Sequence, residues 1–176
     1  MEFHNLMKTM MTVSGNDAGY ALGDVMTGET ATWSGYTTTL TDFADMMNTK
    51  KTQLGLSATT HMTNPSGMDY GVDPDHVTNA IDWVELAHDV MQNSCVREIV
   101  GEPCWEMERD VPFLLGPWLG VSGNTLQTKF CNSFVSGLQS GGFPAMGVKG
   151  GSTPSAKRTG LGSATALGGE AFAAWF

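Results

Sequence analysis

The sequence predicts a mixed α/β domain, with helices in the first part of the chain and strands in the second. Two observations lead to this prediction. Apolar side chains recur at helical spacing as far as residue 101, whereas residues 136–169 are rich in Gly and Ser and compatible with strands. The length of 176 residues fits one domain or a large part of one, and 41% apolar residues can form its core. We therefore expect residues 1–176 to belong to a single domain.

Helices are predicted where apolar residues share one face. Two short helices flank a turn at residues 13–17. Their apolar residues are Leu6, Met7, Met10 and Met11 before the turn, and Ala18, Ala21, Leu22 and Val25 after it. A longer helix is predicted over about 41–54, with Gly55 as its stop. Another is predicted over about 78–92, with Thr78 as its cap and Ile81 on its apolar side.

The remaining segments carry weaker signals. Residues 27–40 are rich in Thr and Gly and predict a loop, and residues 59–69 predict an extended piece that ends in a Pro/Gly turn. Residues 102–120 have no clear period. Residues 130–135 are compatible with a strand, and residues 170–176 predict one or two helical turns.

The composition excludes several classes of function. The net charge is −9 and the chain has no basic run, so nucleic acid is a poor candidate partner. No apolar stretch approaches the roughly 20 residues of a membrane span, and the first residues lack the features of a signal peptide. The histidines show no metal-ligand spacing, so we expect no metal site.

The three cysteines, Cys95, Cys104 and Cys131, do not form a disulfide framework, because their number is odd. A Cys95–Cys104 bridge across a short loop and free thiols both fit the spacing. Of the two interpretations we favour free thiols.

Two short motifs carry residues suited to acyl transfer. Ser14-Gly15-Asn16 lies between the first two predicted helices, and Lys149-Gly150-Gly151-Ser152-Thr153 lies in a Gly-rich segment far downstream. A Ser hydroxyl can relay a proton to a leaving amine, an Asn amide can hold a substrate backbone, and a Lys ammonium can attract a carboxylate. In isolation, however, these residues are better explained as a helix cap and a solvated lysine.

The residues around these motifs resemble those of the serine-type D-alanyl-D-alanine carboxypeptidases, the low-molecular-weight penicillin-binding proteins of the peptidase S11 family. The resemblance is carried, in the family's order, by residues 6–18, 43–48, 54–56, 60–69, 76–87, 96–101 and 147–154. It is close over about residues 3–101 and looser over 145–176. Several motifs in the same order are much more specific than any one of them.

The resemblance implies a penicillin-recognising fold of the α/β (α+β) class, shared with the β-lactamases. In this fold a helical cluster packs on an antiparallel sheet, and the active site lies between them. The family carries three motifs, S-x-x-K, S-x-N and K-T-G, and the first Ser is the nucleophile. Ser14 and Asn16 would form the second motif, and Lys149 would open the third. Gly151, Ser152 and Thr153 would bind substrate, with the Ser152 N–H as an oxyanion-hole donor and Thr153 at the substrate's terminal carboxylate.

Three features depart from the family pattern. No lysine has a serine three residues before it, so S-x-x-K is missing, and we expect the chain to be the C-terminal part of a longer enzyme. Gly150 replaces the Thr of the third motif; residues 157–160, Lys-Arg-Thr-Gly, are a second candidate, but their extra Arg makes Lys149 the better match. Residues 155–160 resemble only the turn of the family's last hairpin, and residues 171–176 resemble its last helix. We expect an incomplete sheet with unpaired edges, and hence low stability or assembly with a missing segment.

The resemblance therefore implies a serine D-Ala-D-Ala carboxypeptidase that trims peptidoglycan stem peptides through an acyl-enzyme. It implies no cofactor, a location outside the cytoplasmic membrane, and β-lactam binding when the nucleophile is supplied. Without that nucleophile we expect the chain alone to be inactive. The alternative is a non-catalytic module that binds cell-wall peptides through Ser14, Asn16 and Lys149. A β-lactamase is less well supported, because no Glu-x-x-x-Asn pattern lies between Asn16 and Lys149.

Overall fold

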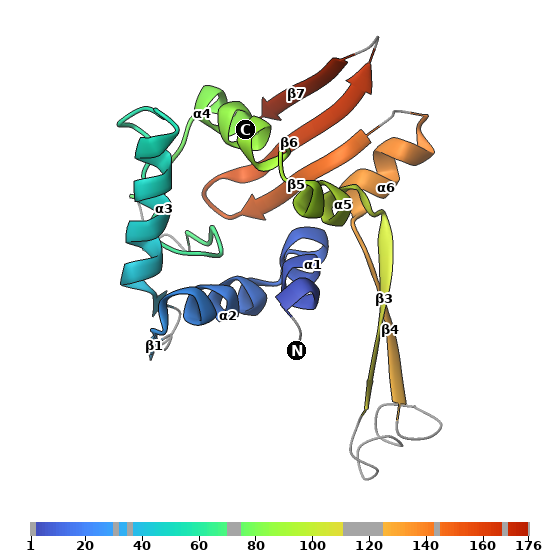
Figure 1. Ribbon diagram of the computed structural model, residues 1–176, viewed down its shortest axis with the longest axis horizontal. Coiled ribbons are helices and arrows are strands. Elements are labelled where there is room, and N and C mark those ends of the chain that lie inside the picture. Colours follow the sequence, from blue (N-terminus) through green and yellow to red (C-terminus); the bar gives the residue numbers. More distant parts are fainter. Residues whose placement is uncertain are drawn as a thin grey trace.

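The computed structural model combines helices with antiparallel strands, as the sequence predicts (Figure 1). It describes residues 3–29, 32–34, 37–69, 75–110, 125–142, 145–166 and 169–175. In this part of the chain, most helices precede the strands that form the sheet. None of the helices there has the length and hydrophobicity needed to cross a bilayer.

The helices of the first part follow the apolar periodicity of the sequence. They are α1 (Phe3–Val13), α2 (Asn16–Thr27), α3 (Thr41–Gln53), α4 (Ala80–Val90) and α5 (Ser94–Gly101). The predicted helices over 41–54 and 78–92 are confirmed, with one correction at a cap. Asn79, not Thr78, caps α4, and its side chain accepts a hydrogen bond from the Asp82 N–H at 3.0 Å. An Asn side chain is the better acceptor at this position, because Thr is a weaker cap.

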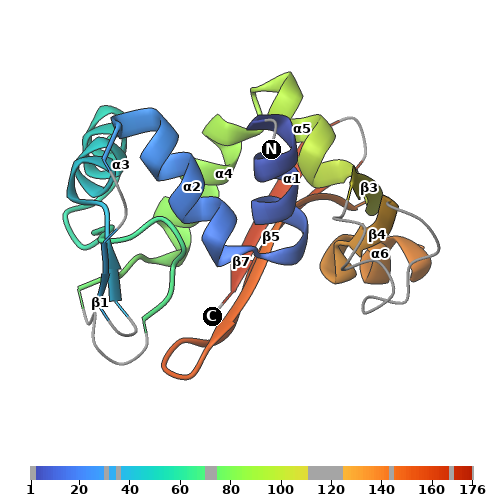
Figure 2. The same ribbon diagram turned by 90° about the horizontal axis from the view of Figure 1, so that it is seen from below.

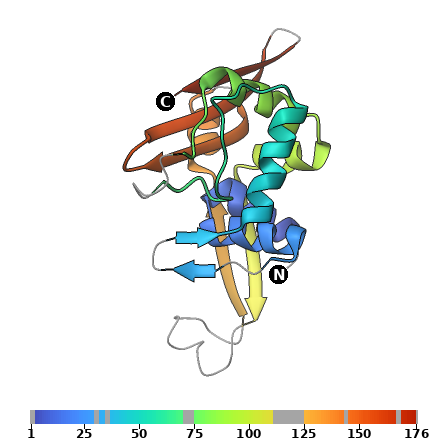
Figure 3. The same cartoon turned by 90° about the vertical axis from the view of Figure 1, so that its left-hand side faces the viewer.

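The prediction of a loop over 27–40 is wrong in two places, where the chain forms short strands. β1 (Thr32–Ser34) and β2 (Thr37–Thr39) pair antiparallel, apart from the main sheet (Figure 3). Threonine is β-branched and favours extended backbone, which outweighs the nearby glycines. The extended piece predicted over 59–69 contains one isolated antiparallel bridge, between His61 and Val77.

The main sheet has three antiparallel strands in the order β5–β6–β7. They are β5 (Ala145–Thr153), β6 (Lys157–Ala166) and β7 (Gly169–Trp175). β5 and β6 pair on both sides of the turn at residues 153–157, so the expectation that only the turn of this hairpin is present is wrong. The helix predicted over 170–176 is also wrong, because residues 169–175 pair with β6 along their whole length.

A small apolar core joins the helices to this sheet. Ala87 of α4 and Met91, which directly follows this helix, pack against three other residues. These are Val100 of α5 and Val148 and Leu161 of the sheet. α4 contacts β6 and β7, while α5 and α6 contact β5 (Figures 1 and 2). α1 lies against α5 and β5 (Figure 2). Two residues that were predicted on apolar helix faces are not buried in this core: Ile81 is 75% exposed and Val25 is 68% exposed.

A two-stranded ribbon projects from the rest of the molecule (Figure 1). It consists of β3 (Cys104–Asp110) and β4 (Thr125–Cys131), paired antiparallel in full register. Residues 111–124 lie outside the described part of the chain. The strand predicted over 130–135 ends early, since α6 (Ser133–Ser140) follows at once. Asn132 stops the strand and starts the helix, because its Oδ1 accepts a hydrogen bond from the Val135 N–H at 3.2 Å.

Candidate functional site

Ser14 lies in a tight turn between α1 and α2. Its φ of 57° is in the left-handed region, where a residue other than glycine is strained. The Gly15 N–H donates to the Thr9 carbonyl at 3.2 Å, and a Cβ on Gly15 would lie 2.8 Å from Thr9 Cγ2. Gly15 also occupies the cap position of α2, which has no side-chain cap. Ser14 therefore does not cap this helix, and its hydroxyl is available for another contact.

Lys149 of β5 reaches this turn from a position 135 residues away in the sequence. Its Nζ donates to Ser14 Oγ and to the Gly150 carbonyl. Burial lowers the pKa of the Lys149 ammonium below its usual range. No carboxylate of the described residues forms an ion pair with it. A lysine in this state can exchange a proton with the Ser14 hydroxyl, as acyl transfer to or from an amine requires.

A cavity of about 560 Å³ opens beside this pair. Four predicted site residues line it: Ser14, Lys149, Gly151 and Ser152. The other two do not. Asn16 is exposed in the first turn of α2, and the Thr153 hydroxyl donates to Asp69 Oδ2 at 2.5 Å. The wall beyond Lys149 is mostly backbone, because Gly150 and Gly151 leave it without bulky side chains.

Arg158 and Asn132 also line the cavity, and the sequence analysis assigned neither a role there. Arg158 stands opposite Ser152 in the register of β5 and β6. Its side chain is exposed and forms no ion pair within the described residues. The sequence does hold a signal for it. A tight turn at residues 153–157 would pair position 158 with position 152. This pairing can be recognised only when the register of the hairpin is known.

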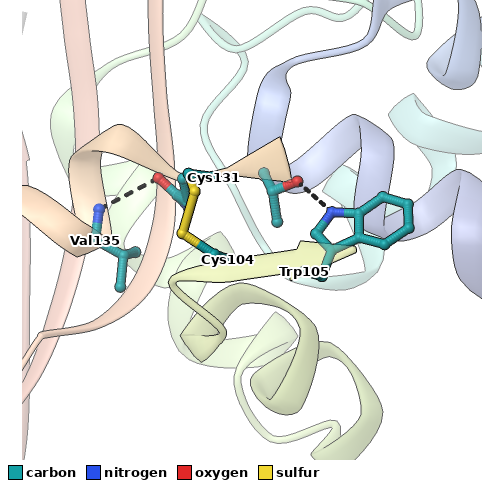
Figure 4. Close-up of a disulfide and its surroundings, with 6 residues drawn as sticks. Cys104, Trp105, Cys131 and Val135 are labelled. Carbon is teal, nitrogen blue, oxygen red and sulfur yellow. Dashed lines mark hydrogen bonds between the residues drawn. A yellow bond between two sulfur atoms is a disulfide. The ribbon is translucent and has the colours of Figure 1, made fainter. Parts of the chain in front are cut away.

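The base of the β3–β4 ribbon forms another wall of the cavity. Cys104 and Cys131 form a disulfide there, so free thiols were the wrong expectation for this pair, and the bridge considered between Cys95 and Cys104 is also wrong (Figure 4). Next to it, the Trp105 Nε1–H donates to Thr12 Oγ1 at 3.0 Å (Figure 4). The Trp105 ring also stacks on Phe130. Cys131 and Thr12 both line the cavity, so these contacts tie the ribbon to the segment that carries Ser14.

No group of three or more His, Cys, Asp or Glu side chains able to hold a metal ion occurs among the described residues. The arrangement offers instead a hydroxyl, a partly buried amine, an arginine and exposed strand backbone. These groups suit the binding of a peptide with a carboxylate, and proton transfer at its amide.

A model of the D-alanyl-D-alanine carboxypeptidases, peptidase S11, matches residues 1–173. The chain belongs to this family. Solved structures agree with this D-alanyl-D-alanine carboxypeptidase assignment. The DD-transpeptidase of Streptomyces K15 is 29% identical with a TM-score of 0.76, and the match covers 97% of this chain and 58% of that one. An evolved penicillin-binding protein homologue from Mycobacterium tuberculosis is 25% identical with a TM-score of 0.75, over 99% of this chain and 55% of that one.

The matched region is thus less than two thirds of those solved chains. No curated protein sequence matches this chain. What the comparisons establish for this carboxypeptidase family member is the family and the penicillin-recognising fold, with its helices and antiparallel strands.

Proposed function

We propose that this chain carries the second and third motifs of a serine D-Ala-D-Ala carboxypeptidase that acts on peptidoglycan stem peptides. The hydrogen bond between Lys149 Nζ and Ser14 Oγ carries the proposal. It joins the two motifs beside one cavity, although they are far apart in the sequence. In the acyl-enzyme mechanism, Ser14 relays a proton to the leaving D-Ala amine, and the lowered pKa of Lys149 lets it take part in that relay.

We assign roles to the other site residues from the functional groups that they carry. Ser152 offers its backbone N–H to the oxyanion, and Gly151 allows the peptide to approach β5 closely. Arg158, opposite Ser152, binds the terminal carboxylate of the peptide, because a guanidinium can form two parallel hydrogen bonds with it. Asn16 does not line the cavity, and its role of holding the peptide backbone from the first turn of α2 is taken from the family resemblance alone. The nucleophilic Ser of S-x-x-K is not among these 176 residues, and the family suggests action outside the cytoplasmic membrane.

Binding of an N-acylated D-Ala-D-Ala dipeptide to the isolated chain, followed by NMR titration, tests this proposal. We expect reversible binding in the millimolar range, and no binding of the D-Ala-L-Ala isomer. Replacing Lys149 by Met removes the ammonium that donates to Ser14 and can attract the ligand's carboxylate. The affinity for the dipeptide should therefore fall at least about tenfold. The matched control is Lys129→Met, since Lys129 is an exposed lysine of β4 outside the cavity. No binding of either isomer at millimolar concentration, or equal loss in both variants, contradicts the proposal.

A second candidate is a peptide-binding module without catalysis, which the same cavity and its Lys149–Ser14 contact would also support. Mass spectrometry after incubation with penicillin separates the two functions. The isolated chain should form no covalent adduct in either case. The enzyme function additionally requires a nucleophile, so a protein that contains this chain together with an S-x-x-K segment should become acylated. A binding module would stay unmodified in that protein as well.

A further inference from the structure

The segment that precedes Asp69 is held rigidly by its own side chains. Asn64, only 6% exposed, accepts hydrogen bonds through Oδ1 from the N–H groups of Ser66 and Gly67 at 3.1 and 2.8 Å. Its Nδ2 donates to the Met68 carbonyl at 3.1 Å. This closed loop presents the next residue, Asp69, in a defined position.

Asp69 connects this loop to the end of β5. The Thr153 hydroxyl donates to Asp69 Oδ2 at 2.5 Å, across 84 residues of sequence. The same hydroxyl accepts from the Ala156 N–H at 3.0 Å. The Thr153 hydroxyl oxygen thus links a turn amide to a carboxylate. Because this hydroxyl donates its proton to the carboxylate, its oxygen becomes a stronger acceptor for the amide.

The turn held in this way carries the cavity's arginine. Thr153 pairs with Lys157, and Ser152 pairs with Arg158, directly beyond the turn. The turn is short, because Thr153 and Lys157 already pair across it, and the φ of 61° at Lys157 lies in the left-handed region. Both Ser152 and Arg158 line the cavity, whereas Asp69 and Thr153 do not.

We propose that Asp69 is a positioning residue for ligand binding. Through the Thr153 hydroxyl it fixes the β5–β6 turn, and so holds Ser152 and Arg158 where a ligand carboxylate binds. Asp69 itself does not touch the ligand. The inference rests on the proposed function, because it names the residue that sets the geometry of the carboxylate site. It also gives the Thr153 hydroxyl a partner within the protein instead of the ligand carboxylate.

The first measurement needs no ligand. Amide hydrogen exchange of Ala156, followed by NMR, reports the bond to Thr153. In Thr153→Val and Asp69→Ala we expect this exchange to accelerate about tenfold, while the amides of the α4 core stay unchanged. Thr153→Ser and Asp69→Asn keep a hydroxyl and an acceptor oxygen, so they should restore much of the protection. Ser155→Ala is the matched control, because Ser155 lies in the same turn and makes no hydrogen bond within the described residues.

The second measurement compares two ligands, the N-acylated D-Ala-D-Ala dipeptide and its C-terminal amide. Asp69→Ala and Thr153→Val should weaken binding of the carboxylate ligand about tenfold and leave the weaker binding of the amide unchanged. The double variant should lose no more than either single variant, because the two residues act through one contact. A general loss of folding would instead reduce binding of both ligands.

The outcomes separate this inference from the proposed function. If wild type binds the carboxylate ligand and Asp69→Ala binds it equally well, the positioning role is overturned and the proposed function stands. If wild type binds neither ligand, the proposed function fails, and the positioning role fails with it even where Ala156 exchange reveals the anchor. If Asp69→Asn loses as much as Asp69→Ala, the acceptor oxygen is not what positions the turn, and the inference is overturned.

Discussion

The helical part of the chain and its strand part are held together in different ways. In the described residues of the helical part, the ends of helices are set by contacts between neighbours in sequence. Asn93 caps α5 by accepting from the Cys95 and Val96 N–H groups, and α2 ends at Gly28 in the left-handed conformation. The described strands of the second part are set instead by pairing with another strand, as in the β3–β4 ribbon with its Cys104–Cys131 disulfide and in the β5–β6–β7 sheet.

This difference determines what each part of the sequence reveals. A cap or an apolar helical face is encoded within a few residues, so it can be recognised without knowing the rest of the fold. A strand pairing depends on a partner elsewhere in the chain, and on the register that joins them. The candidate site lies where the two parts meet, with Ser14 from the helical part and Lys149 from the strand part. We expect the two parts to respond differently when their contacts are broken.

Removal of the disulfide should have the largest effect. The two cysteines are 27 residues apart, so opening the loop with Cys104→Ser and Cys131→Ser should lower the free energy of unfolding by about 3.5 kcal/mol. Chemical denaturation measures this change. Cys95→Ser is the control, because Cys95 is an exposed free thiol, and it should leave stability unaltered. If the ribbon is held mainly by its backbone pairing, the double variant will instead resemble the control.

A second pair of substitutions compares two glycines in helices. A Cβ on Gly23 of α2 would lie 2.5 Å from Leu40 Cδ1, and Leu40 is fully buried, so Gly23→Ala should destabilise the protein by about 2 kcal/mol. The same change at Gly137 of α6 meets no atom within 4 Å. Alanine has the better helix propensity, so Gly137→Ala should stabilise by about 0.5–1 kcal/mol. Thermal unfolding of both variants tests the opposite signs, and a shift of the same sign in both would contradict this account of packing at α2.

The sequence was sufficient for α3 and α4, because their apolar periods and stops are local. It was insufficient for β7. An Ala-rich segment over 170–176 has good helix propensity, but in the fold it completes a sheet by pairing Leu161 with Ala174 and Ser163 with Phe172. Tertiary pairing therefore outweighed propensity. The Cys104–Cys131 bridge was missed for the same reason, since it requires the register of β3 and β4.

The candidate site, like the fold, could be predicted from the sequence only in part. Ser14 and Lys149 were brought together by the resemblance to a family, because their spacing alone carries little information. Their contact across the cavity is a property of the fold. Arg158 and Asp69 were overlooked because each is placed by a neighbour that only the structure identifies. Arg158 faces Ser152 through the hairpin register, and Asp69 meets Thr153 through the loop that follows Asn64.

A final prediction concerns acid, where the helical part should respond first. Asp82 is buried at the start of α4 and accepts hydrogen bonds from Ser57, from Asn79 and, at 2.5 Å, from the Thr60 hydroxyl. These bonds, led by that of the Ser57 side chain, lower the pKa of Asp82 from 3.8 to about 2. Because the unfolded chain binds the proton more readily, Asp82 contributes stability above about pH 4, and this contribution is lost as the pH falls to about 2.

Urea unfolding at a series of pH values measures that dependence. In wild type, the free energy of unfolding should fall between about pH 4 and pH 2, and in Asp82→Asn this part of the fall should be absent. Asp45→Asn is the matched control, because Asp45 is exposed on α3 and makes no hydrogen bond within the described residues, so its profile should follow wild type. If Asp82→Asn keeps the wild-type acid dependence, the network around Ser57 and Thr60 does not tie α4 to the preceding loop as described. If the expected difference is found, the strand part is the more robust of the two in acid, because its disulfide and its backbone strand pairing do not titrate in this range.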